Sequence, residues 1–191
     1  MDDDPQNLGD LERAAAGPAA RAALAWVQAA LNGHFAASWA GLDPAFRTVL
    51  AQEWIGSNQG VLSLDPGAER DAVVAALAAA EPEHRIWREH GQRVLRRNVE
   101  RLVEPLRGMQ YGTGTKPRLI PPDLEAVILL DLADLPVDKH GIAYLPSGEG
   151  RPSYALLMRA GHDGHLVRGV GTGVYDPGWP PTWTEVLRPE D

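Results

Sequence analysis

Apolar side chains recur at helical spacing through the first half of the chain and at strand spacing through the second. Leu24, Val27 and Leu31 repeat every three to four residues, as on one face of a helix. This periodicity continues to about Leu106, and from about Asp123 short β-branched runs replace it. Helices followed by strands, without alternation between them, predict an α+β fold.

Turn and capping residues divide the first half into five predicted helices. Asn32-Gly33 is typical of a helix end, and Asp43-Pro44 combines an N-cap with a first-turn proline. Asp65-Pro66 repeats this start, and Glu81-Pro82 ends the helix that follows. The predicted helices cover about 11–31, 35–42, 44–56, 66–80 and 83–106.

A glycine-rich break at 107–117 separates these helices from four predicted strands. The strands cover about 124–132, 142–145, 153–160 and 165–170, the last reaching to Val174 at most. Asp163-Gly164 is the strongest short hairpin signal among them. The predicted architecture is a set of helices packed on one face of a strongly bent, mainly antiparallel sheet.

We expect one α+β domain at 11–191, because 191 residues suit a single core. Residues 1–10 are expected to be disordered, since three consecutive aspartates repel one another and bury nothing. From about residue 176 we expect an irregular tail rich in proline and tryptophan. Adjacent prolines at 180 and 181 cannot donate to a central ladder.

Composition narrows the classes of partner. The net charge of −8 gives no electrostatic footprint for nucleic acid or an anionic membrane, so neither is expected as a partner. The absence of cysteine excludes disulfides and thiol catalysis. The acidic N-terminus is unlike a signal peptide, and the apolar run near Ala126–Leu130 is too short to span a bilayer. A cytoplasmic protein is therefore expected.

Several runs carry a resemblance to a known superfamily. The run Ala25–Trp39 ends one helix at Asn-Gly-His-Phe and begins the next, and further runs lie at 112–127, 156–159 and 177–181. Over roughly residues 20–181 the chain resembles uncharacterised actinobacterial members of the nuclear-transport-factor-2-like superfamily. That resemblance implies a cone-like fold. The superfamily includes isomerases, cyclases, dehydratases and non-enzymatic binders, so it does not select one function.

Tryptophans on the predicted helices are the first candidate ligand contacts. Trp39, Trp54 and Trp87 would lie over a pocket, where their indole N–H groups could meet a ligand oxygen. Arg159 in the third predicted strand could bind a ligand carboxylate or form a structural ion pair. The alternative for each tryptophan is helix-to-sheet packing, the commoner role of aromatic residues at helical spacing.

The candidate catalytic group is Asp131, which lies inside an apolar strand on the same face as Val127 and Leu129. On a concave face, burial would raise its pKa toward that of a general base. Tyr111 or Tyr144 could then donate to a developing oxyanion. On a convex face, Asp131 is a solvated residue at a strand end.

Other motifs lack the context that their chemistry requires. His162 and His165 flank a turn without a third metal ligand, so no metal is expected. The glycine runs at 112–116 and 169–173 are not followed by helices, as phosphate and dinucleotide loops are, so no cofactor is expected.

The best-supported function from sequence is a non-catalytic small-molecule-binding or protein-interaction domain. A small apolar ligand and a homodimer are the expected partners, because an open sheet face needs covering. The alternative is a cofactor-independent isomerase, cyclase or dehydratase that uses a pocket carboxylate as general base. A third hypothesis is a regulatory partner that contacts another protein through Trp179–Trp183 or the arginines of the fifth helix.

Overall fold

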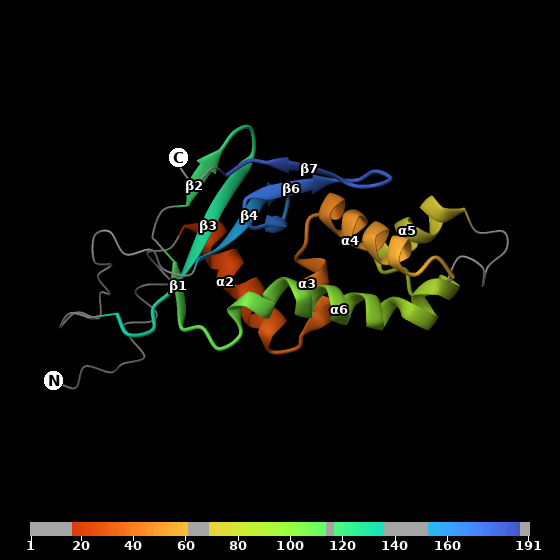
Figure 1. Cartoon of the computed structure of the whole chain (residues 1–191), viewed down its shortest axis with the longest axis horizontal. Coiled ribbons are helices and arrows are strands. Elements are labelled where there is room, and N and C mark those ends of the chain that lie inside the picture. Colours follow the sequence, from red (N-terminus) through yellow and green to blue (C-terminus); the bar gives the residue numbers. More distant parts are fainter. Residues whose placement is uncertain (1–16, 61–68, 114–116, 136–152, 188–191) are drawn as a thin grey trace.

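The computed structural model describes residues 17–60, 69–113, 117–135 and 153–187. The expected disordered N-terminus, the predicted strand at 142–145 and the candidate Tyr144 lie outside the described residues. Within them, helices pack against an antiparallel sheet, which confirms the α+β class (Figure 1).

The helical half follows the predicted order. Five α-helices, one π-helical turn and one 3-10 turn are described: α2 Pro18–Leu31, α3 Phe35–Ala40, α4 Pro44–Ser57, α5 Arg70–Ala79, η2 Trp87–Gly91, α6 Gln92–Val103 and η3 Glu104–Leu106. The predicted cap is confirmed, because Asp43 accepts a hydrogen bond from the Ala45 N–H at 2.9 Å at the start of α4. The predicted helix at 83–106 is interrupted by the π-helical turn, which the spacing of its leucines does not reveal.

The main sheet has five antiparallel strands. They are β1 Tyr111–Thr113, β2 Arg118–Ile120, β3 Leu124–Asp131, β4 Ser153–Gly161 and β5 Gly164–Val170. β1 and β2 both pair with β3, and the order continues through β4 to β5. The Asp163-Gly164 hairpin is confirmed. The expected start of the sheet near Asp123 is wrong, because the segments on either side of the break already pair with β3.

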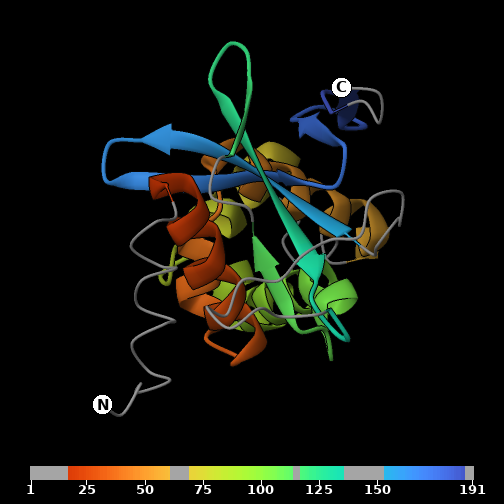
Figure 2. The ribbon, with the colours of Figure 1, turned by 90° about the vertical axis from the view of Figure 1, so that its left-hand side faces the viewer.

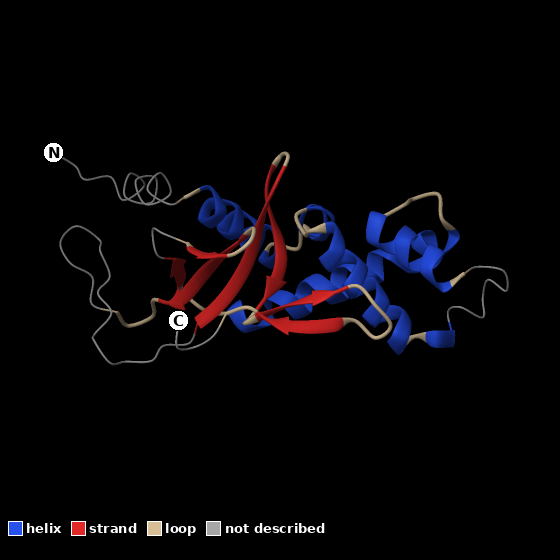
Figure 3. Ribbon diagram, turned by 90° about the horizontal axis from the view of Figure 1, so that it is seen from above, coloured by secondary structure: helices blue, strands red, loops and turns tan. Residues whose placement is uncertain are grey.

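The expected irregular tail is also wrong. β6 Gly173–Asp176 and β7 Thr182–Glu185 form a two-stranded ribbon. Pro180 and Pro181 lie in the loop of this ribbon, where no ladder donor is needed. Figure 3 shows the ribbon extending from the main sheet alongside the helices.

Each face of the main sheet carries its own apolar cluster. Val127, Leu129 and Leu156 face the helices and belong to the larger cluster, which includes residues of α2, α4, α5 and α6. The opposite face holds a smaller cluster, to which Leu157 of β4 and Val174 of β6 belong. Figure 2 shows α2 crossing close to the sheet and the β2–β3 hairpin projecting beyond it. The sheet is therefore the middle layer between the helices and the base of the ribbon.

A buried ionic cluster joins α4 to the sheet and to the ribbon. The loop before α4 pairs with β5, where Asp43 N–H donates to the Val167 carbonyl at 2.8 Å. Arg168, only 2% exposed, occupies the bulge of β5 and lies 3.8 Å from the Asp43 carboxylate. It donates to the Tyr175 carbonyl at 2.7 Å and to the Asp176 carboxylate. One guanidinium thus holds the first turn of α4 and the end of β6 together.

Replacing Asp43 should destabilise the fold through two losses. Asp43→Ala removes the cap of α4 and one counter-ion of a buried arginine, so we expect a loss of about 3 kcal/mol. Asp43→Asn keeps a capping oxygen and should lose less. The measurement is urea unfolding followed by circular dichroism. Asp123→Ala is the control, because Asp123 pairs with Arg159 while half exposed and should change stability by less than about 1 kcal/mol. Equal stabilities of Asp43→Ala and the control would contradict the role of the cluster.

Candidate functional site

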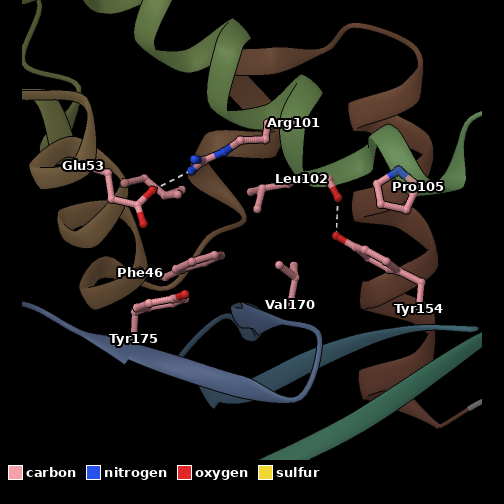
Figure 4. A pocket seen from close by; sticks show the side chains of 9 residues that line it. Phe46, Glu53, Arg101, Leu102, Pro105, Tyr154, Val170 and Tyr175 are labelled. Carbon is pink, nitrogen blue, oxygen red and sulfur yellow. Dashed lines mark hydrogen bonds and ion pairs between the residues drawn. The ribbon is translucent and has the colours of Figure 1, made fainter. Parts of the chain in front are cut away.

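An open groove lies where α4, the end of α6 and the strands of the sheet and ribbon meet. Its volume is about 260 Å³. Figure 4 shows the side chains that surround it. They are Phe46, Leu50, Glu53, Arg101, Leu102, Pro105, Tyr154, Val170 and Tyr175. All of these residues belong to described elements, and together they come from five parts of the chain.

Helical spacing explains which residues of α4 line the groove. Phe46, Leu50 and Glu53 stand at i, i+4 and i+7 on α4 and therefore share one face. Arg101 and Leu102 are near the end of α6, and Pro105 follows in the 3-10 turn. The two helices therefore supply opposite walls, mainly apolar and with one ion pair between them.

Tyr154 of β4 closes one end of the groove. Its hydroxyl donates to the Leu102 carbonyl, and the residue is 9% exposed. Burial raises the pKa of this phenol well above its ordinary value. The Tyr154 hydroxyl is therefore neutral, and its proton is already donated in a hydrogen bond. The side chain forms a wall of the groove and supplies no free acid or base.

The polar end of the groove is formed by Glu53 and Arg101. Arg101 Nη2 lies 2.7 Å from Glu53 Oε2, and the arginine side chain is 56% exposed. The same nitrogen lies 3.4 Å from Oδ1 of Asn98, a residue that is 5% exposed. In Figure 4 the guanidinium reaches from α6 toward α4 across this end. A charged edge thus borders an otherwise apolar surface.

Exposed aromatic residues continue the groove onto the ribbon. Tyr175 of β6 is 37% exposed and pairs across the ribbon with Trp183 of β7, which is 48% exposed. The indole of Trp183 lies against Gly173, where a Cβ atom would stand only 2.4 Å from the indole nitrogen. Glycine at this position therefore lets the ring lie flat on the ribbon, beside Tyr175.

The tryptophans predicted as ligand contacts are not among the residues that line this groove. Trp39 is 1% exposed, and its indole N–H donates to the Ala78 carbonyl at 3.2 Å. Trp54 is buried with its ring 5.5 Å from that of His90. Trp87 packs on Gly91, where a Cβ atom would overlap its ring at 2.5 Å. In the structure these side chains pack in or against the core, which is the alternative given above.

Two of the candidate catalytic residues are neighbours. Register places Tyr111 of β1 directly across from Asp131 of β3, at the end of the strand. Asp131 Oδ1 accepts a hydrogen bond from the Ala133 N–H at 3.0 Å, so this carboxylate closes a local turn. Partial burial raises the pKa of the Tyr111 phenol. This pair is not part of the groove.

Arg159 forms the structural ion pair that was one of its two alternatives. Its guanidinium lies 3.3 Å from Asp43 and 2.8 Å from Asp123. His165 lies 3.0 Å from Glu125, while His162 is exposed beside Asp163. Among the described residues, no group of three or more metal-ligating side chains is present.

Comparisons with known proteins give no match. No family model matches this sequence. No curated protein and no solved structure matches it. The resemblance to the nuclear-transport-factor-2-like superfamily therefore stays a prediction, and the groove is interpreted from its own geometry. No helix in the described part of the chain is long and apolar enough to cross a membrane.

Sequence reasoning missed most of the groove. In the sequence, the spacing of Phe46 and Leu50 indicates only the apolar side of a helix, and Arg101 is one of several arginines on the fifth predicted helix. The pair formed by Glu53 and Arg101 joins positions 48 apart, which no local pattern reveals. The one available signal was the i, i+7 spacing of Phe46 and Glu53, which places a charge at the edge of an apolar stripe.

Tyr154→Phe should show that this hydroxyl has a structural role. At neutral pH the lost hydrogen bond should lower the free energy of unfolding by about 1 kcal/mol. Because the folded-state pKa is raised, the hydroxyl favours folding fully below the unfolded pKa near 10, and this contribution declines as pH rises above it. The stability of wild type relative to Tyr154→Phe should therefore fall by about 1.4 kcal/mol per pH unit above pH 10, so that the variant becomes the more stable protein by about pH 11.

Urea unfolding at pH 7 and at pH 11 measures both effects. Tyr175→Phe is the matched control, because Tyr175 is more exposed and its hydroxyl has no hydrogen-bond partner within the described ranges. It should change stability little at pH 7. A Tyr154→Phe protein as stable as wild type at pH 7 would contradict the proposed hydrogen bond.

Proposed function

We propose that this protein binds a small apolar molecule in the groove between α4, α6 and the ribbon, without catalysing a reaction. The observation that supports this proposal is the lining of the groove. Five of its nine residues have hydrocarbon side chains, two are tyrosines, and the remaining two are the ion pair at the edge. Apolar walls with a few polar groups are typical of small-molecule sites.

The size of the groove limits the ligand. A volume of about 260 Å³ is just below the lower end of the range for drug-sized ligand pockets, which begins at roughly 300 Å³. Phe46 and Tyr175 offer ring surfaces close to each other, as Figure 4 shows. Ring surfaces attract other rings in offset or edge-to-face arrangements. One or two fused rings, or a short branched chain, would therefore suit the site.

The absence of a convergent acid–base set within the groove favours binding over catalysis. The Tyr154 hydroxyl is engaged with a backbone carbonyl, and Glu53 is paired with Arg101. Neither group is free to abstract a proton in the arrangement described.

A second candidate function is proton transfer at the Asp131 and Tyr111 pair, as in a cofactor-independent isomerase or cyclase. The observation that favours it is the cross-strand register, which places a carboxylate beside a phenol whose pKa is raised. It ranks second because Asp131 already accepts a backbone hydrogen bond and therefore has a structural role.

Filling the groove should abolish binding. The probe is 2-naphthamide, a neutral two-ring molecule, titrated by isothermal calorimetry. Wild type should bind it with a Kd of about 10 µM to 1 mM, corresponding to roughly 4–7 kcal/mol. Val170→Phe, which adds a ring at a lining position, should weaken binding at least tenfold.

The control for this experiment is Leu119→Phe. Leu119 is 75% exposed on β2 and does not line the groove, so this variant adds a ring of the same size elsewhere. It should bind the probe as wild type does. Equal binding by wild type and Val170→Phe, or no binding by wild type, would contradict the proposed function.

A further inference from the structure

Arg101 has unused hydrogen-bonding capacity at the edge of the groove. A guanidinium carries five N–H donors in a planar fork. Only Nη2 has partners, Glu53 and Asn98, so Nε and Nη1 have none among the described residues. The side chain is 56% exposed, and so these remaining donors are accessible to a ligand.

We propose that the ligand is an amphipathic anion, with an apolar ring body in the groove and a carboxylate on Arg101. This inference rests on the proposed function. A guanidinium N–H donates a strong, charge-assisted hydrogen bond to a carboxylate, and the unengaged Nη1 belongs to the same guanidinium that lines the apolar surface. The ring body and the anionic head are therefore recognised by adjacent parts of one site.

The existing ion pair does not fill this capacity. Glu53 contacts Nη2 of Arg101, and so a second carboxylate can accept a hydrogen bond from Nη1 without displacing it. Asn98 precedes Arg101 by three residues on α6 and is 5% exposed. Its carbonyl oxygen accepts from Nη2, which restricts the orientation of the fork. Asn98 is thus a positioning residue, and Arg101 is the residue that contacts the ligand.

A cationic ligand is the alternative, because Glu53 and three aromatic rings also line this site. Glu53 is already neutralised by Arg101 at 2.7 Å, and any cation would have to approach that guanidinium. The net charge of −8 disfavours anions at long range, but charges farther apart than about 8 Å are largely screened at physiological ionic strength. The hydrogen-bond donors of Arg101 at the site therefore decide the preference for an anion over a cation.

The test compares three probes with the same ring system. They are 2-naphthoate, 2-naphthamide and 2-naphthylmethylammonium, which are anionic, neutral and cationic at pH 7. Each is titrated into the full-length protein at 150 mM salt. Wild type should bind naphthoate at least tenfold more tightly than naphthamide, and the ammonium compound most weakly.

Two variants test whether Arg101 causes the preference for the anionic probe. Arg101→Met keeps an apolar side chain of similar length along the groove, and it should bind naphthoate and naphthamide equally within about twofold. Arg96→Met is the matched control, because Arg96 also lies on α6, also pairs with a glutamate and is not a groove residue. It removes the same net charge and should leave the anion preference unchanged. Circular dichroism confirms that both variants are folded.

The outcomes separate this inference from the proposed function. If naphthamide binds as tightly as naphthoate, or the ammonium compound binds best, the anion inference fails while groove binding stands. The inference also fails if the preference persists in Arg101→Met or disappears in Arg96→Met. If naphthamide does not bind to wild type, the proposed function itself fails.

Discussion

The buried guanidinium of Arg168 is the contact on which the arrangement of layers depends. It lies within reach of Asp43 at the start of α4 and donates to Tyr175 and Asp176 at the end of β6. A buried charge is stable only with its partners in place, so these segments must come together for the protein to fold. The bulge in β5 makes this possible, because the extra residue there turns Arg168 toward the ribbon.

The groove follows from this anchoring. Asp43 sets the start of α4, and farther along the helix Gln52 accepts a hydrogen bond from Gly178 N–H in the loop of the ribbon at 3.1 Å. Beyond it, Trp179 donates to Asp71 of α5 at 2.7 Å and stacks with Arg70 at 3.8 Å. The ribbon is therefore attached at both ends. The groove lies between the ribbon, α4 and α6 (Figure 4).

Much of the fold could be predicted from local signals, and little of the site. Asp43-Pro44 and Asp163-Gly164 act through their immediate neighbours, so the helix start and the hairpin were predicted correctly. The strand at Thr182–Glu185 was not predicted, because adjacent prolines are unfavourable within a strand. In the structure Pro180 and Pro181 lie in the loop that allows this strand to pair with β6. Asp131 and Tyr111 were chosen separately, and only the register makes them neighbours. Arg168 carries no local signal of burial, since its partners depend on tertiary structure.

Mapping the binding surface by amide chemical shifts on titration with 2-naphthamide tests the central claim most directly. If the ligand binds in the groove, the perturbed amides should cluster along 46–53 and 101–106 and at Tyr154, Val170 and Tyr175. Perturbations centred instead on Arg70 and Trp179, which line a separate cavity of about 370 Å³, would contradict the assignment of the site. Perturbations at Tyr111 and Asp131 alone would favour the second candidate function over the first.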